Sequence, residues 1–140
     1  MKLWMQPIFD NLSYLMSLLH NGEEEETTQQ MVARLIKDDD VELEALTYIR
    51  GRSISKQYVV VDEAQNLTPH EVKTIISRVG EGTKIVLTGD PEQIDNPYLD
   101  SSSNGLTYTV ERLKGRQGCG HVTLSKSERS SLSALAAEYL

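Results

Sequence analysis

The sequence predicts an α/β fold built on a mostly parallel sheet. Residues 58–61 read Tyr-Val-Val-Val, and residues 84–88 read Lys-Ile-Val-Leu-Thr. Short continuous apolar runs rich in β-branched residues are typical of parallel strands that are buried on both faces. Residues 68–79, which lie between them, have apolar side chains at helical spacing. A strand, a helix and a second strand in this order predict a right-handed βαβ unit.

The segment between the two apolar runs carries signals for both ends of a helix. Thr68 can serve as the N-cap, Pro69 suits the first helical position, and Glu71 is placed to complete a capping box. Gly80 is placed to end the helix, because glycine readily adopts the left-handed conformation that closes many helices. The inward face of this helix is expected to consist of Val72, Ile75, Ile76 and Val79.

The remaining elements are short and lie on both sides of this unit. A first helix is expected to open at Pro7 and to be ended by Gly22, with an inward face of Ile8, Leu12, Leu15, Met16 and Leu19. A second helix covers 31–36, and the alternation over 41–45 predicts a strand. Beyond the βαβ unit we expect a helix capped by Ser103, a strand over 121–124 and a helix capped by Ser127. Together these elements fit one domain over residues 1–140.

Composition narrows the class of protein. The chain has 140 residues, 39% of them hydrophobic, which supports a modest core. Its single cysteine, Cys119, excludes a disulfide within the chain and suits a reducing compartment. No targeting signal is visible, and the apolar runs are far shorter than the roughly 20 residues of a membrane span. We therefore expect a cytoplasmic protein without a membrane partner.

The charge distribution bears on nucleic-acid binding. A net charge of −7 argues against RNA binding by this chain alone. Basic residues nevertheless concentrate in two places, around Arg50 and Arg52 and again over residues 112–116. Either cluster could contact a phosphate backbone within a larger protein, and either could be an ordinary solvated face.

Acidic and amide side chains follow both predicted strands. Asp62 and Glu63 come directly after the first strand, and Asp90 and Gln93 follow the second. Because the carboxyl ends of neighbouring parallel strands meet at one edge of a sheet, these side chains are expected to share the ligand crevice. Adjacent Asp and Glu at this point are the Walker B arrangement of nucleoside triphosphatases, in which Mg²⁺ and phosphate offset the acidic charge. A solvated acidic turn is the alternative.

The central motifs resemble those of a known family. Residues 59–95, VVVDEAQNLTPHEVKTIISRVGEGTKIVLTGDPEQID, resemble the core of the PhoH-like ATPases. Their DEAQ and GDPEQ segments are also similar to motifs II and III of superfamily 1 helicases. The Arg-Gly-Arg at residues 50–52 matches the RGR that precedes this core in the family. Residues 96–115 and 120–140 resemble the subgroup in which a PIN-type nuclease domain is fused upstream.

The resemblance implies ATP hydrolysis coupled to RNA in the complete protein, with ATP and Mg²⁺ as cofactors. It implies that Asp62 holds Mg²⁺ through water, that Glu63 is the general base and that Gln93 senses the γ-phosphate. Arg129 follows a predicted strand and resembles the arginine that stabilises charge on the γ-phosphate. The further residues implied at the site are Gln65 and Asp90 for ATP, and Arg50 and Arg52 for RNA or phosphate.

One motif of such ATPases is missing from these 140 residues. A phosphate-cradling loop of the form G-x-x-x-x-G-K-[ST] does not occur, and Gly82-Thr83-Lys84 leads into a strand rather than a helix. The sequence therefore predicts the carboxyl-terminal part of an ATPase domain. Its fold would be a partial P-loop NTPase-type three-layer fold without the phosphate-loop strand. The alternative function is a non-catalytic interaction or regulatory module.

The missing strand has a consequence for packing. In P-loop proteins the strand that feeds the phosphate loop is central, so its absence should expose a strand edge and apolar surface beside 59–61 or 85–87. Because open edges invite pairing, we expect a homo-oligomer, or an edge that the amino-terminal helices cover.

The missing loop also gives a prediction about nucleotide affinity. The 140-residue chain should bind Mg·ATP weakly or not at all, because the loop normally supplies most of the phosphate contacts. Titration calorimetry should then detect no binding in the low micromolar range. A micromolar dissociation constant together with ATP hydrolysis by this chain would contradict the prediction.

Overall fold

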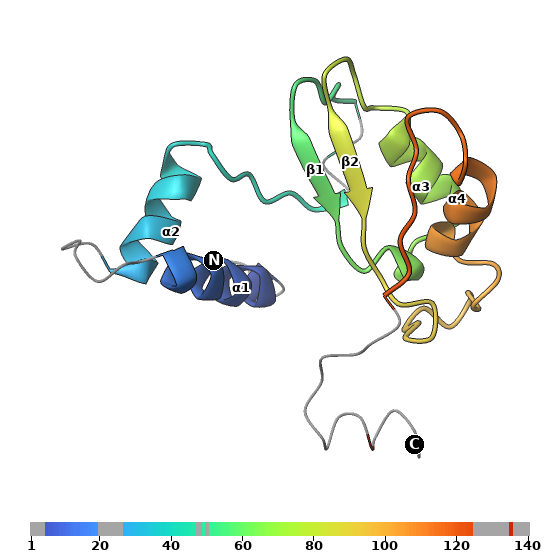
Figure 1. The fold of residues 1–140 in the computed structure, drawn as a ribbon, viewed down its shortest axis with the longest axis horizontal. Coiled ribbons are helices and arrows are strands. Elements are labelled where there is room, and N and C mark those ends of the chain that lie inside the picture. The colour runs from blue at the N-terminus through green and yellow to red at the C-terminus, as the bar shows by residue number, and fades with distance from the viewer. Residues whose placement is uncertain (1–4, 20–26, 47–48, 50, 125–134, 136–140) are drawn as a thin grey trace. The chain divides into compact units, whose positions relative to one another are not determined.

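The computed structural model describes residues 5–19, 27–46, 49, 51–124 and 135. The chain divides into two compact units, residues 1–51 and residues 52–140. The first unit contains α1 (Gln6–Leu19) and α2 (Thr28–Lys37). The second contains β1 (Tyr58–Val61), the 3₁₀ helix η3 (Ala64–Asn66), α3 (Pro69–Ile76), β2 (Lys84–Leu87) and α4 (Gly105–Leu113), as Figure 1 shows.

Within the first unit, α1 and α2 contact each other. The helix α2 begins with a capping box between Thr27 and Gln30, and its Met31 and Val32 are buried. Both helices were expected, but part of the predicted inward face of α1 is wrong, because Leu15 and Leu19 are exposed. None of the described helices is long and apolar enough to cross a membrane.

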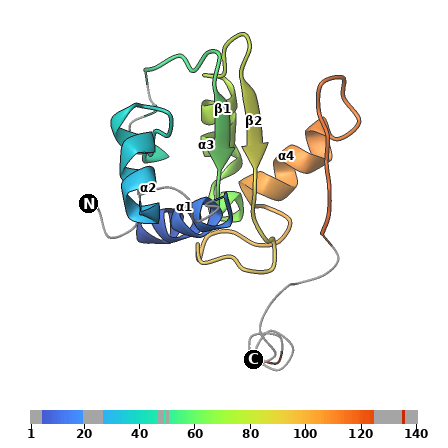
Figure 2. The same cartoon turned by 60° about the vertical axis from the view of Figure 1, so that its left-hand side comes forward.

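The second unit is organised by the predicted βαβ unit. The strands β1 and β2 pair in parallel, with Tyr58 opposite Lys84 and Val61 opposite Leu87. The sheet among the described residues has these two strands, and α3 lies behind them in Figure 2. The predicted α/β class with a parallel sheet is therefore confirmed.

The two faces of β1 differ in burial, which corrects one expectation. Val61 is buried, whereas Tyr58 is 68% exposed and Val60 is 58% exposed. Successive residues of a strand point to opposite faces, so only one face of β1 packs inward. The expectation of a strand buried on both faces is wrong for this chain, and the expected exposed apolar surface is present.

The helix α3 follows its sequence signals at its start and departs from them at its end. Thr68 and Glu71 form the capping box, and Pro69 is the first residue, as predicted. The helix ends at Ile76, before Gly80, because the following residues turn to pair with another segment. The Ile54 amide donates to Arg78 O at 2.8 Å, and the Gly80 amide donates to Ile54 O at 2.6 Å.

Two predicted strands are not formed. Over 41–45 the burial alternates as expected, with Glu42 and Glu44 exposed, but the segment is not part of a ladder. The alternation of exposed and less exposed residues therefore arises here without pairing to a second strand. Residues 121–124 have no regular structure, and Val122 and Leu124 are 80% and 85% exposed. The helix predicted from Ser127 lies outside the described residues.

The helix α4 is attached to the start of α3 through a buried cap. Its N-cap is Asn104 rather than the predicted Ser103, and the Asn104 side chain accepts from the Thr107 amide at 2.9 Å. Asn104 is fully buried and its Nδ2 donates to Asp100 O at 2.9 Å. The next residue, Gly105, donates to Leu67 O at 2.7 Å, and a Cβ there would lie 2.5 Å from Val72 Cγ2.

The buried cap gives a prediction about stability. Asn104→Ala should lower the free energy of unfolding by about 2–4 kcal/mol, because it removes a helix cap together with the hydrogen bonds of a fully buried side-chain amide. The matched control Ser103→Ala should cost under about 1 kcal/mol, because Ser103 is exposed and does not cap α4. Urea unfolding of the chain measures both. An equal or larger cost for Ser103→Ala would contradict the assignment of the cap.

Candidate functional site

The carboxyl ends of β1 and β2 remain paired beyond the strands themselves. The Thr88 amide donates to Val61 O and the Ala64 amide donates to Thr88 O, both at 2.9 Å. This pairing places the Thr88 hydroxyl next to the carboxylate of Asp62, to which it donates at 2.7 Å. The edge where ligands bind in open α/β sheets is thus formed by Asp62 and the residues that follow each strand.

Glu63 has a backbone conformation that is uncommon for its residue type. Its φ of 54° and ψ of 37° lie in the left-handed region, and it stands at the N-cap of η3. This conformation costs roughly 1–2 kcal/mol for a residue with a Cβ. Such strain often occurs at functional sites, where the surrounding structure compensates for it. Here it turns the chain sharply from β1 into η3, while the Glu63 side chain stays exposed.

Gln65 connects Glu63 to the loop after β2. Its side chain is fully buried. The amide Nε2 donates to Glu63 Oε2 at 2.5 Å and to the backbone oxygen of Gln93 at 2.9 Å. Its Oε1 accepts from the Asp90 amide at 3.3 Å. One buried amide therefore bonds to both chain segments of the site.

The surroundings of Gly89 leave little room for a side chain at this position. A Cβ at residue 89 would lie 2.2 Å from Gln65 Oε1 and 3.2 Å from the Ala64 amide nitrogen. The first distance is too short for a methyl group and the second is tight, so a side chain here would displace the Gln65 amide. The structure assigns Gly89 a packing role that sequence reasoning missed, although a glycine directly after a predicted strand was a visible signal.

The loop after β2 is a compact turn held by Asp90. The carboxylate of Asp90 accepts from the Glu92 amide at 3.0 Å and from the side-chain amide of Gln93. The backbone amide of Gln93 also donates to the backbone oxygen of Asp90 at 3.0 Å. Gln93 is exposed, so its side chain lies at the surface of the site beside Asp90.

Asn66 fixes the next part of this loop. Its Oδ1 accepts from the Asp95 amide at 2.7 Å and from the Asn96 amide at 3.3 Å. Asn96 Nδ2 returns a bond to Asn66 O at 3.2 Å. Sequence reasoning missed both asparagines, whose only signal was the ability of short amide side chains to bond nearby backbone.

The comparisons with known proteins agree with these motifs. The family model described as PhoH-like protein matches residues 1–138. The chain belongs to this PhoH-like family. It is 58% identical over 140 residues to Protein PhoH2 of Bacillus subtilis (strain 168). This match covers all of the chain and 30% of the length of the relative. It is 37% identical over 137 residues to Protein PhoH2 of Mycolicibacterium smegmatis, covering 98% of the chain and 29% of the relative.

A third relative carries the family name itself. The PhoH-like protein of Bacillus subtilis (strain 168) is 34% identical over 125 residues, which are 89% of the chain and 35% of that protein. The chain therefore spans about a third of the length of these relatives. The family resemblance expected from the motifs is confirmed, and with it the nucleotide-binding P-loop class in general.

The structure of this PhoH-family chain brings most of the predicted site residues together. Asp62, Glu63, Gln65, Asp90 and Gln93 gather at the carboxyl ends of β1 and β2 through the bonds described above. Among these five residues Gln65 is distinct, because it is buried whereas Asp62, Glu63 and Gln93 are exposed.

The predicted arginines are placed differently. Arg52 is exposed and lies two residues before Ile54, which pairs with Val79 on the stretch leading to the amino end of β2. Arg52 of this PhoH-family chain thus precedes a segment that lies beside the amino ends of the strands, whereas the site lies at their carboxyl ends. Arg50 and Arg129 lie outside the described residues.

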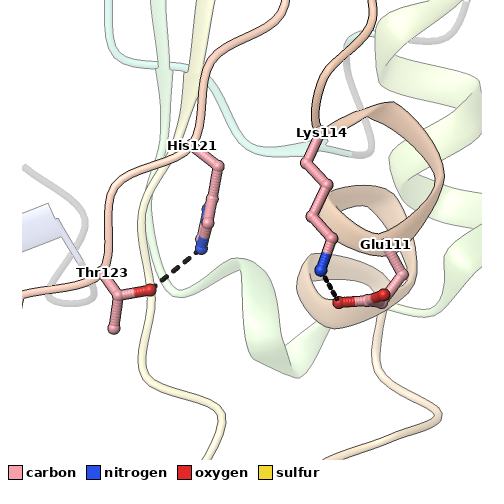
Figure 3. A network of polar contacts seen from close by, with 4 residues as sticks. All are labelled: Glu111, Lys114, His121 and Thr123. Atoms are coloured by element: carbon pink, nitrogen blue, oxygen red, sulfur yellow. Dashed lines mark hydrogen bonds and ion pairs between the residues drawn. The ribbon is translucent and has the colours of Figure 1, made fainter.

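Two basic residues of the second cluster, over residues 112–116, contact neighbouring side chains at the surface. Lys114 pairs with Glu111 at 2.6 Å, and Arg112 lies over the Tyr108 ring at 5.0 Å from its centre. Figure 3 shows the Lys114–Glu111 pair and a separate contact of His121, whose Nε2 lies 3.0 Å from Thr123 Oγ1. These exposed contacts stabilise little and fit a solvated face better than a phosphate contact.

The donor atoms at the strand ends suit magnesium. Mg²⁺ usually keeps several waters and binds through one or two carboxylates together with phosphate oxygens. The exposed carboxylate of Asp62 offers about four lone-pair sites, of which Thr88 uses one. In the part of the chain that the structure describes, no three His, Cys, Asp or Glu side chains form a metal cluster.

Proposed function

We propose that this chain contributes the hydrolytic half of an ATPase site. The observation that carries the proposal is the cluster at the carboxyl ends of β1 and β2, where Asp62 and Glu63 lie beside the loop that holds Gln93. The phosphate-binding half would lie outside these 140 residues, in the additional sequence by which the relatives are longer than this chain. Mg²⁺, when bound, neutralises charge that develops on the transferred phosphate.

The roles proposed for the site residues follow from their placement. The Glu63 carboxylate is exposed and can accept the proton of an attacking water. Asp62, oriented by the Thr88 hydroxyl, would hold Mg²⁺ through water. The exposed amide of Gln93, held beside Asp90, can donate to a phosphate oxygen. Arg129 is proposed to stabilise charge on the γ-phosphate.

The finer features of the complete protein are also proposals. RNA as the coupled substrate rests on the motifs shared with helicases and on the Arg-Gly-Arg at 50–52. A PIN-type nuclease domain upstream rests on the resemblance of 96–115 and 120–140 to that subgroup. Homo-oligomer formation is supported by the exposed apolar side chains of Tyr58 and Val60 on the sheet. The proposed compartment is the cytoplasm.

A second candidate function is a non-catalytic interaction or regulatory module. It is favoured by the absence of a G-x-x-x-x-G-K-[ST] segment from the 140 residues. The exposed face of β1, with Tyr58 and Val60, is a surface on which such a module could bind another chain.

The role of Glu63 can be tested in a chimera in which this chain replaces the matching segment of Bacillus subtilis PhoH2, a 58% identical relative. Glu63→Gln should retain ATP binding and lower turnover by about a hundredfold or more, because it keeps the shape and removes the base. Asp62→Asn should weaken Mg²⁺-dependent binding instead. Steady-state kinetics and a binding titration measure both effects.

Glu92→Gln is the matched control, because Glu92 is an exposed carboxylate in the neighbouring loop after β2 and has no assigned role. It should leave turnover and binding unchanged. Equal rates for the wild-type chimera and Glu63→Gln would remove the proposed base. A wild-type chimera that shows no Mg²⁺-dependent ATP turnover would favour the interaction module.

A further inference from the structure

We infer that Gln65 is a positioning residue that sets the orientation of the Glu63 carboxylate according to the position of the loop over residues 89–93. This inference rests on the proposed role of Glu63 as general base. It assigns Gln65 a role inside the protein, because a side chain with no exposed surface does not face a ligand in this structure.

The hydrogen bonds of Gln65 determine which way its amide faces. A glutamine amide has two donors on nitrogen and an acceptor oxygen, and its two ends must be assigned from their partners. The backbone oxygen of Gln93 only accepts, and the backbone amide of Asp90 only donates. These two loop groups therefore fix Nε2 and Oε1, and the second N–H on Nε2 is left for Glu63 Oε2 at 2.5 Å.

Packing removes the remaining freedom of this amide. A Cβ on Gly89 would lie 2.2 Å from Gln65 Oε1 and 3.0 Å from Leu106 Cδ2, so the loop backbone and α4 enclose the amide closely. Because the amide is buried, turning it would leave polar groups without partners and without water. The amide therefore has one stable orientation as long as the loop stays in place.

The loop that fixes Gln65 is the loop that carries the proposed phosphate sensor. Gln93 uses its backbone oxygen for Gln65 and its side chain for Asp90. A movement of Gln93 toward or away from a phosphate would therefore shift the acceptor that orients the Gln65 amide. Through Gln65 the same movement reaches the carboxylate of Glu63.

The test uses Gln65→Glu in the chimera with Bacillus subtilis PhoH2. The new carboxylate keeps the shape and can still accept from Asp90, but it cannot donate and it repels Glu63. We expect kcat to fall about tenfold or more while KM changes less than about threefold. We also expect the acid limb of the pH–rate profile to move to higher pH, because two adjacent carboxylates retain a shared proton.

Combining this change with Glu63→Gln separates positioning from simple destabilisation. A residue that acts through Glu63 has no further effect on kcat once the base is removed, so Gln65→Glu should leave kcat of the Glu63→Gln variant unchanged. If Gln65→Glu lowers kcat equally in both backgrounds, or leaves kcat and the pH profile as in the wild type, the inference is overturned. If Glu63→Gln alone has wild-type activity, the proposed function fails first.

A second variant covers the case in which Gln65→Glu does not fold. Gly89→Ala displaces the amide without changing its chemistry, because the added methyl carbon would lie 2.2 Å from Oε1 and would overlap it. It should lower kcat and lose this effect in the Glu63→Gln background. The matched control is Gly80→Ala, where a Cβ would lie 3.1 Å from Ser55 Cβ near the amino end of β2. Normal kcat for Gly89→Ala would contradict the inference.

Discussion

The site of this chain depends on one buried side-chain amide. Gln65 has no exposed surface, and its amide bonds to Glu63 on one segment and to Asp90 and Gln93 on another. Buried polar groups without partners are costly, so the residues after β1 and β2 must keep the geometry that satisfies this amide. The close approach of Gly89 and the left-handed backbone of Glu63 are both consistent with that requirement.

Local signals made the βαβ unit predictable. Three signals involve only residues that are close in sequence: the apolar runs of β1 and β2 and the Thr68–Glu71 capping box of α3. The structure contains all three. Because parallel strands end at one edge, the meeting of Asp62 with the loop after β2 followed from topology alone. The end of α3 did not, because it depends on pairing between Gly80 and Ile54, which are distant in sequence.

The elements that failed depended on partners that no local pattern reveals. Residues 41–45 show the burial of a strand without joining a ladder, and 121–124 are exposed. The N-cap of α4 is Asn104 rather than the predicted Ser103, because the longer Asn104 side chain reaches both the Thr107 backbone amide and the carbonyl of Asp100. The role of Gln65 was not visible either, because burial of a polar residue depends on tertiary packing.

Exchange of the Gln65 side-chain amide protons tests the central claim most directly. Measured by NMR on the 140-residue chain, both Nε2 protons should exchange with solvent on the order of a hundredfold more slowly than those of Gln117, which is exposed. Slow exchange should be lost in Gly89→Ala. Exchange of Gln65 as fast as that of Gln117 in the wild-type chain would show that the amide is open to water, and would contradict the account.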